Sequence, residues 1–139
     1  MTLMNTKKFN DVKEGDSLPA LSIPITVPLI AGGAIATRDY FPGHHDLEAA
    51  QALGSPHIFM NILTTNGLVE RFVEDWAGPQ AVFKSIKIKL GIPNYPGDTM
   101  VLTGEVSDLN PQAKSVTVTL KGKNGMGNHV TGTVCVVLQ

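Results

Sequence analysis

Residues 55–79 read SPHIFMNILTTNGLVERFVEDWAGP, and this stretch decides how the rest of the chain is interpreted. Ser55 suits a helix N-cap and Pro56 the first helical position, while Gly78-Pro79 ends the run. Apolar residues recur in between at the spacing of a helix: Ile58, Ile62, Val69, Phe72, Val73 and Trp76. Because the apolar arc is wide, we expect one long and largely buried helix.

The sequence after this helix predicts strands. Four runs alternate apolar and polar residues, as strands with one buried face do, and they cover 85–90, 100–106, 116–121 and 130–138. Turn-forming residues separate the runs: Pro93 to Gly97, Asp108 to Pro111, and Asn124-Gly125. Asn-Gly is a strong signal for a tight hairpin, so we expect an antiparallel sheet.

The segment before the helix is less regular. Residues 1–17 are polar and unpatterned, which predicts a loosely held arm or a first edge element. Prolines in 18–29 are spaced too closely for a helix, so an extended edge segment fits there. Asp46 can cap a short helix over 47–53. The order predicts an α+β fold, an antiparallel sheet wrapped around one long central helix. This is the order of the hot-dog fold, in a single domain over 1–139.

Charge is scarce in this chain of 139 residues. Charged residues make up 17%, against roughly 25% in an average soluble domain, so we expect another subunit to cover part of the surface. The net charge of −1 argues against a nucleic-acid partner. Disordered chains combine low hydrophobicity with high net charge, and this composition excludes that class.

The cellular compartment is predicted from two features, the scarcity of cysteine and the prolines that interrupt the longest uncharged segment. Cys135 is the single cysteine, which excludes an intrachain disulfide, a zinc ribbon and a CxxC pair, and we expect no metal site. The uncharged segment 18–36 is long enough for a membrane span, but it contains Pro19, Pro24, Pro28 and Gly32-Gly33. These residues argue against a continuous helix, so we expect no membrane contact and a cytoplasmic location.

Asp39 and His44 are the first candidates for chemistry. They lie five residues apart in a predicted loop, with Pro42 and Gly43 between them. Such a carboxylate and imidazole can hold a water between an anionic acceptor and a neutral ring nitrogen, which raises the nucleophilicity of the water. The alternative is a solvated loop in which Asp39 caps a turn and His44 is exposed, and spacing alone favours this alternative.

The predicted long helix offers two further features. The amides of its first turn have no intrahelical partner, and the Ile58 amide can stabilise developing negative charge on a thioester oxygen. The alternative is that the Ser55 hydroxyl caps this amide. Asn66 and Gly67 lie within the helix, where glycine costs about 1 kcal/mol against alanine. A wall of a substrate pocket there is as well supported as a purely structural role.

The stretch Asp39-Tyr40-Phe41-Pro42-Gly43-His44 resembles the MaoC-like, (R)-specific enoyl-CoA hydratase family, whose hallmark is Asp-x-Asn-Pro-x-His. Phe41 stands where the family has Asn. The family's His-Gly pair, which opens the central hot-dog helix, is His57-Ile58 here, and its mid-helix Ser-Gly is Asn66-Gly67. Within the family, the chain from about residue 20 onward is similar to the small hydratase subunits of steroid side-chain degradation. The run Asp75-Trp76-Ala77-Gly78-Pro79 is the most distinctive part of this similarity.

The resemblance implies that Asp39 and His44 are catalytic. They would deprotonate a water that adds to C3 of a trans-2-enoyl-CoA, while the Ile58 amide binds the thioester oxygen and Asn66-Gly67 line the pocket. It implies a 3-hydroxyacyl-CoA product, with a bulky steroid-type acyl group as one option. Coenzyme A enters as part of the acyl-CoA thioester, and no separate cofactor is expected. The expected assembly is a homodimer or a heteromer with a larger MaoC-like subunit.

Two other functions stay open. A hot-dog acyl-CoA thioesterase also uses a carboxylate and a helix N-terminus, but such enzymes usually place the carboxylate on the long helix. In this chain, the carboxylates Glu70 and Glu74 lie toward the far end of the predicted helix. The third reading is a non-catalytic hot-dog subunit that only supports another chain.

Overall fold

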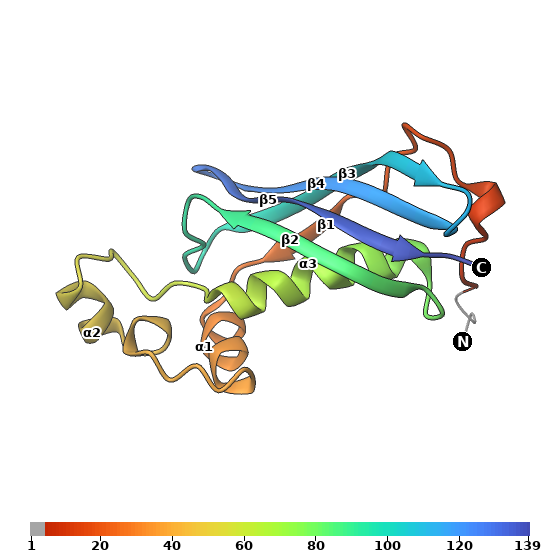
Figure 1. Cartoon of the computed structure of the whole chain (residues 1–139). Helices are drawn as coiled ribbons and strands as arrows, with labels where there is room; N and C mark the ends of the chain where they lie inside the picture. The colour runs from red at the N-terminus through yellow and green to blue at the C-terminus, as the bar shows by residue number, and fades with distance from the viewer. Residues whose placement is uncertain (1–4) are drawn as a thin grey trace.

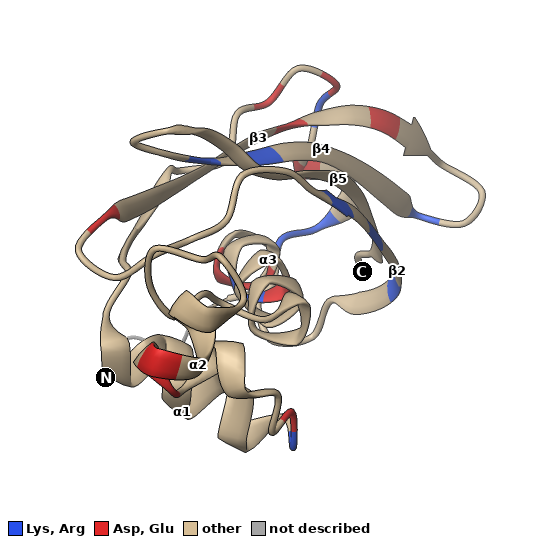
Figure 2. Ribbon diagram, turned by 90° about the vertical axis from the view of Figure 1, so that its left-hand side faces the viewer, with Lys and Arg blue, Asp and Glu red and all other residues tan. Residues whose placement is uncertain are grey.

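The computed structural model describes residues 5–139 as a five-stranded antiparallel sheet that arches over one long helix (Figures 1 and 2). The strand order is β1-β3-β4-β5-β2. The helices are η1 (Phe9–Asp11), α1 (Val27–Ala36), η2 (Pro42–His44), α2 (Leu47–Ala52) and α3 (Ile62–Ala77). The strands are β1 (Leu21–Pro24), β2 (Val82–Leu90), β3 (Thr99–Asn110), β4 (Ser115–Asn124) and β5 (Gly127–Val137). The predicted α+β architecture and its four late strands are confirmed.

The core lies between α3 and the concave face of the sheet. Val69, Phe72 and Val73 of α3 are at most 2% exposed. Along β4, buried residues alternate with outward-facing polar ones, as the sequence pattern predicted. Gly104 of β3 permits close contact of helix and sheet, because a Cβ there would lie 3.1 Å from a ring carbon of Phe72. The helix therefore sits close against the middle of the sheet.

The long helix begins later than the sequence predicted. Its N-cap is Asn61, whose Oδ1 accepts a hydrogen bond from the Thr64 amide at 3.0 Å, and residues 55–61 are irregular. The predicted start at Ser55-Pro56 is wrong because the chain carries two sets of start signals, and the second one is used. Ile58 is buried although it lies in the loop, so it fitted the apolar period that was taken for a helix.

Helix α1 was missed by the sequence analysis, which predicted an extended segment over 18–29. Only Leu21–Pro24 is a strand, and a helix begins at Val27. Pro28 lies in the first turn, where its missing N–H has no intrahelical partner to lose, and the Thr26 hydroxyl caps the Leu29 amide at 3.1 Å. Gly33 lets α1 approach α3, because a Cβ there would collide with the Thr64 side chain.

The N-terminal segment is held against the domain from residue 5 onward. The Lys7 amide donates to the Ala77 carbonyl at 2.8 Å, and the Phe9 amide donates to the Gln139 carbonyl at 2.9 Å. Val12 is buried and Ser17 forms a bridge with Glu105 of β3. For residues 1–4, the expectation of a loose arm or edge element lies outside the described residues.

The expected short helix and its cap are confirmed. Helix α2 begins after Asp46, whose carboxylate accepts a hydrogen bond from the Ala49 amide at 3.1 Å. It lies beyond one end of the sheet, whereas α1 lies beneath the start of α3, on the side away from the sheet (Figure 1). Between residues 5 and 139, no helix has the length and apolar character that crossing a membrane requires.

Candidate active site

Asp39 and His44 meet at the end of the domain where α1 and α2 lie. Asp39 follows α1 and His44 ends η2, and the Nε2 atom of His44 lies 3.4 Å from Oδ2 of Asp39. The His44 side chain is 9% exposed and that of Asp39 is 29% exposed. The alternative is therefore wrong in its expectation of an exposed His44, but Asp39 does cap a turn, because its Oδ1 accepts from the Phe41 amide at 3.3 Å. The two groups converge, as the family resemblance implied and as spacing alone did not favour.

The hydrogen bond made by Nδ1 of His44 determines whether Nε2, the nitrogen that faces Asp39, carries a hydrogen. Nδ1 lies 2.6 Å from the carbonyl oxygen of Phe59. Because a carbonyl can only accept, Nδ1 carries the hydrogen, and in the neutral ring Nε2 keeps its lone pair. Nε2 and the Asp39 carboxylate are then two acceptors that face each other. A water that lies to one side of the pair, within hydrogen-bond reach of both atoms, can donate a hydrogen to each.

Two aromatic rings enclose His44. The Phe41 ring centroid lies 5.4 Å from that of His44 at an interplanar angle of 67°, and the Phe59 centroid lies 4.8 Å away at 79°. Both geometries are edge-to-face contacts. Gly43 completes the arrangement, because a Cβ there would lie 2.9 Å from both phenylalanine rings. Phe41, which departs from the family pattern, thus packs against the candidate base.

Asn61 is a site residue that the sequence analysis did not single out. Its Nδ2 donates to Oδ2 of Asp39 at 3.0 Å and to Oγ1 of Thr37 at 2.9 Å. This hydrogen bond is the main cause that lowers the pKa of Asp39 below its ordinary value of 3.8. Partial burial opposes the shift, whereas the Phe41 amide and the charge of His44 add to it. An N-cap residue directly before an apolar run was the signal that could have found Asn61.

The structure places Ile58 away from the first turn of α3. Its amide donates instead to Nδ1 of His57 at 2.8 Å, and its side chain is 2% exposed. The predicted reason for an oxyanion-binding role, a free amide at a helix N-terminus, is therefore wrong. The predicted cap by the Ser55 hydroxyl is wrong too, since that hydroxyl donates to the His57 carbonyl at 2.6 Å. Thioester binding by the Ile58 amide stays a prediction.

Asn66 and Gly67 lie one turn or more into α3. Asn66 is half-buried, Gly67 is exposed, and a Cβ at Gly67 would meet open space. Close packing within this chain thus does not explain the glycine. No hydrogen bond among residues 5–139 joins either residue to Asp39 or His44. Their role as a pocket wall stays a prediction.

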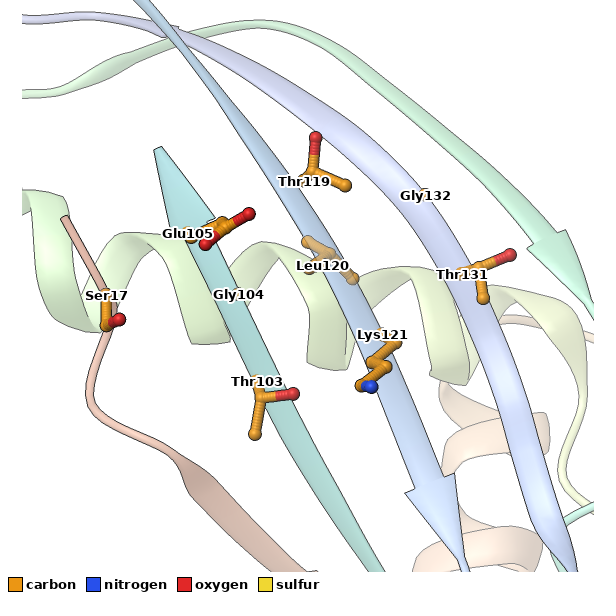
Figure 3. Close-up of a pocket in the computed structure, with 9 residues that line it drawn as sticks. All are labelled: Ser17, Thr103, Gly104, Glu105, Thr119, Leu120, Lys121, Thr131 and Gly132. Atoms are coloured by element: carbon orange, nitrogen blue, oxygen red, sulfur yellow. The ribbon is translucent and has the colours of Figure 1, made fainter. Parts of the chain in front are cut away.

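A hollow of about 520 Å³ lies elsewhere, on the face of the sheet opposite α3 (Figure 3). Thr103, Thr119, Lys121 and Thr131 of three neighbouring strands line it. None of the candidate catalytic residues contributes to this hollow. Whereas the charged Lys121 helps to line this hollow, α1, which lies beside the candidate site, carries no charged residue (Figure 2).

The fold is that of the hot-dog proteins, as solved structures show. The structure superposes on one chain of the crystal structure described as the ChsH1-ChsH2 complex from Mycobacterium tuberculosis. The TM-score is 0.88 at 45% identity, and the match covers 91% of this chain and 98% of that chain. A structure described as (R)-hydratase from A. caviae involved in PHA biosynthesis matches in fold at 20% identity. Its TM-score is 0.84, and the match covers 92% and 98% of the two chains.

The family follows from sequence comparisons. Residues 11–126 match the model of the MaoC like domain, so the chain belongs to the MaoC-like family of dehydratases and hydratases. A curated relative, the 3-oxo-4,17-pregnadiene-20-carboxyl-CoA hydratase beta subunit of Mycobacterium tuberculosis, is 48% identical over 120 residues. These residues cover 86% of this chain and 92% of the relative. The resemblance that the residues Asp39 to His44 suggested is confirmed.

Proposed function

We propose that the protein is an enoyl-CoA hydratase that adds water across the double bond of a trans-2-enoyl-CoA to give a 3-hydroxyacyl-CoA. The observation that carries this proposal is the 3.4 Å separation of His44 Nε2 and Asp39 Oδ2, with His44 Nδ1 engaged by the Phe59 carbonyl. In the neutral form of His44, an unprotonated Nε2 faces the Asp39 carboxylate, and this arrangement supports activation of a water.

The proposed reaction moves one water onto the substrate. The water donates its two hydrogens toward Nε2 of His44 and Oδ2 of Asp39, so a lone pair of its oxygen is free to attack C3. As the new C–O bond forms, one proton passes to the pair and the π electrons move onto the thioester as an enolate. The pair then delivers this proton to C2, which completes the product and returns the pair to its starting state. General acid-base catalysis of this kind contributes roughly two to four orders of magnitude.

The thioester oxygen needs a donor as the enolate forms. We assign this role to the Ile58 amide, as the family resemblance implies, although its hydrogen now points to Nδ1 of His57. The assignment requires the His57 ring to turn away when substrate binds. Loss of one such donor commonly costs about 3 kcal/mol in the transition state.

A bulky, steroid-type acyl group is the proposed substrate. The 48% identical relative is named as a hydratase subunit for a pregnadiene carboxyl-CoA, which supports this choice. Large apolar side chains beside the site also remain exposed: Ile35 at 58%, Phe41 at 46%, Ile62 at 51% and Leu63 at 49%. A polycyclic acyl group would remove this apolar surface from water. Asn66 and Gly67, on α3, are proposed to line the same pocket.

The proposed assembly is a heteromer with a larger MaoC-like subunit, and a homodimer is the alternative. The match to the ChsH1-ChsH2 complex supports the heteromer. Strand β2 is an edge of the sheet, and its Val82 is 51% exposed, so this edge is a candidate contact. Since the proposed substrate is a coenzyme A thioester, a cytoplasmic location is proposed as well.

The test is the loss of absorbance of the enoyl thioester band. Short-chain and steroid enoyl-CoAs are offered to the protein alone and together with a candidate larger subunit, and co-purification reports the assembly. We expect absorbance loss without release of free thiol. Release of coenzyme A thiol would favour the thioesterase, whose carboxylates on α3, Glu70 and Glu74, are exposed and far along the helix. Activity that survives the loss of Asp39 in the complex would favour a non-catalytic subunit.

A further inference from the structure

We propose that Asn61 is a positioning residue of the hydration reaction, which holds the Asp39 carboxylate in the orientation that faces His44. This inference rests on the proposed function and extends it to a residue outside the Asp/His motif. Asn61 belongs to a different segment of the chain, because it is the N-cap of α3, and it lies 22 residues after Asp39.

The Asn61 amide group is fully used and buried. Its Nδ2 donates to Asp39 Oδ2 at 3.0 Å and to Thr37 Oγ1 at 2.9 Å. Its Oδ1 accepts from the Thr64 amide at 3.0 Å, and its exposure is 2%. Turning the amide over would place its oxygen against a carboxylate and its NH₂ against an N–H. The hydrogen-bond partners therefore fix one orientation.

These bonds tie Asp39 to two rigid elements. The Thr37 hydroxyl donates to the Gly33 carbonyl at 2.8 Å, so Asn61 is anchored to the end of α1 as well as to the start of α3. The Asp39 carboxylate carries a second restraint, because Oδ1 accepts from the Phe41 amide at 3.3 Å. With both oxygens held, the carboxylate cannot rotate freely away from His44.

Oδ2 of Asp39 is the atom that contacts both Asn61 and His44. It accepts from Asn61 and lies 3.4 Å from Nε2 of His44. His44, from η2, is the titratable group whose charge acts on Asp39, and the contacts from Asn61 and the Phe41 backbone are neutral. A neutral donor strengthens the preference for the ionised carboxylate without adding a charge to the site. The second lone pair of Oδ2 stays available for a water.

The competing explanation is that Asn61 only caps α3. Two variants separate the roles: Asn61→Ser and Asn61→Asp each keep an oxygen that can accept from the Thr64 amide. Serine has a shorter side chain, and an ionised aspartate cannot donate to Asp39. Thr26→Ala is the matched control, because Thr26 caps α1 through the Leu29 amide at 3.1 Å. All variants are assayed as full chains, with any subunit that activity requires.

For both Asn61 variants we expect kcat to fall at least tenfold, with KM within about twofold of the wild type. The NMR titration of the Asp39 carboxyl carbon should shift its midpoint to higher pH, further for Asn61→Asp because of the added carboxylate. Thr26→Ala should lower Tm and leave kcat and the titration unchanged. Unchanged kcat and an unchanged midpoint in the Asn61 variants, or loss of activity only in proportion to unfolding, would overturn the proposal.

Two further measurements keep the test decisive. In the wild-type protein, the Asn61 side-chain amide hydrogens should exchange slowly with solvent, and exchange as fast as that of a free asparagine would contradict the inference without any variant. Asp39→Asn is assayed in parallel. If Asp39→Asn remains fully active, the proposed function itself fails. If it is inactive while the Asn61 variants behave as wild type, the role of Asn61 alone fails.

Discussion

Nδ1 of His44 lies 2.6 Å from the carbonyl oxygen of Phe59, and this contact depends on where α3 begins. In a helix that started at Ser55, the Phe59 carbonyl would accept from the amide of Leu63, four residues later. Because α3 starts at Ile62, the carbonyl is free to orient the imidazole. The loop before α3 thus determines which nitrogen of His44 can act as a base.

The rings around His44 leave no room for a larger residue at position 43. A Cβ at Gly43 would lie 2.9 Å from Phe41 and Phe59, so Gly43→Ala should displace these rings and His44 with them. We expect kcat for enoyl-CoA hydration to fall at least tenfold. Gly32→Ala is the matched control, since a Cβ there meets open space. Full activity of Gly43→Ala would show that the packing around His44 does not matter.

Two helical glycines should respond in opposite ways to the same substitution. A Cβ at Gly33 would collide with Thr64, so Gly33→Ala should lower the free energy of unfolding by about 1–3 kcal/mol. At Gly67 a Cβ meets open space, and alanine should raise stability by up to about 1 kcal/mol. Urea denaturation of both variants measures the difference. Equal effects would mean that the contact between α1 and α3 is looser than described.

The Gly67→Ala substitution also tests whether Gly67 lines the pocket for the acyl group. If the open space beside it holds the acyl group, Gly67→Ala should raise KM for a steroid enoyl-CoA more than for a short-chain one, although the fold is not weakened. Steady-state kinetics with the two substrates provide the comparison. Identical kinetics of variant and wild type with both substrates would place the pocket elsewhere.

His129 makes stability depend on pH. Its Nε2 lies 2.8 Å from Thr65 Oγ1 and its Nδ1 lies 2.7 Å from the Ile92 carbonyl, and burial lowers its pKa below 6.5. A lowered pKa means that the unfolded chain binds a proton first as the pH falls. The stability is therefore fully present above pH 6.5 and is lost as the pH drops toward the folded-state pKa, at up to about 1.4 kcal/mol per pH unit.

The measurement for His129 is urea denaturation at pH 7.5 and pH 5.5. The wild type should lose more stability between the two values than His129→Gln, which has no titrating ring. The hydrogen bond to Thr65 can be retained by the Gln side chain. The prediction fails if both proteins lose the same free energy over this range.

The sequence predicted the elements whose signals are local. The alternating strands and the Asp46 cap follow from patterns within about ten residues, whereas the Asp39/His44 pair was implied by the family resemblance. Helix α1 was missed because its proline lies in the first turn, where a proline is tolerated. The role of Asn61 could not be predicted, since it depends on a contact between residues 39 and 61 that only the folded chain creates.

The central claim is that Asp39 and His44 direct a water to C3 of an enoyl-CoA. The most direct test is turnover in H₂¹⁸O, with mass spectrometry of the product. We predict one ¹⁸O in the 3-hydroxyl group of an intact acyl-CoA, and no such product from Asp39→Asn or His44→Ala. His45→Ala, at the exposed neighbouring position, should behave as wild type. Label in a free carboxylic acid, or undiminished labelling by both site variants, would contradict the claim.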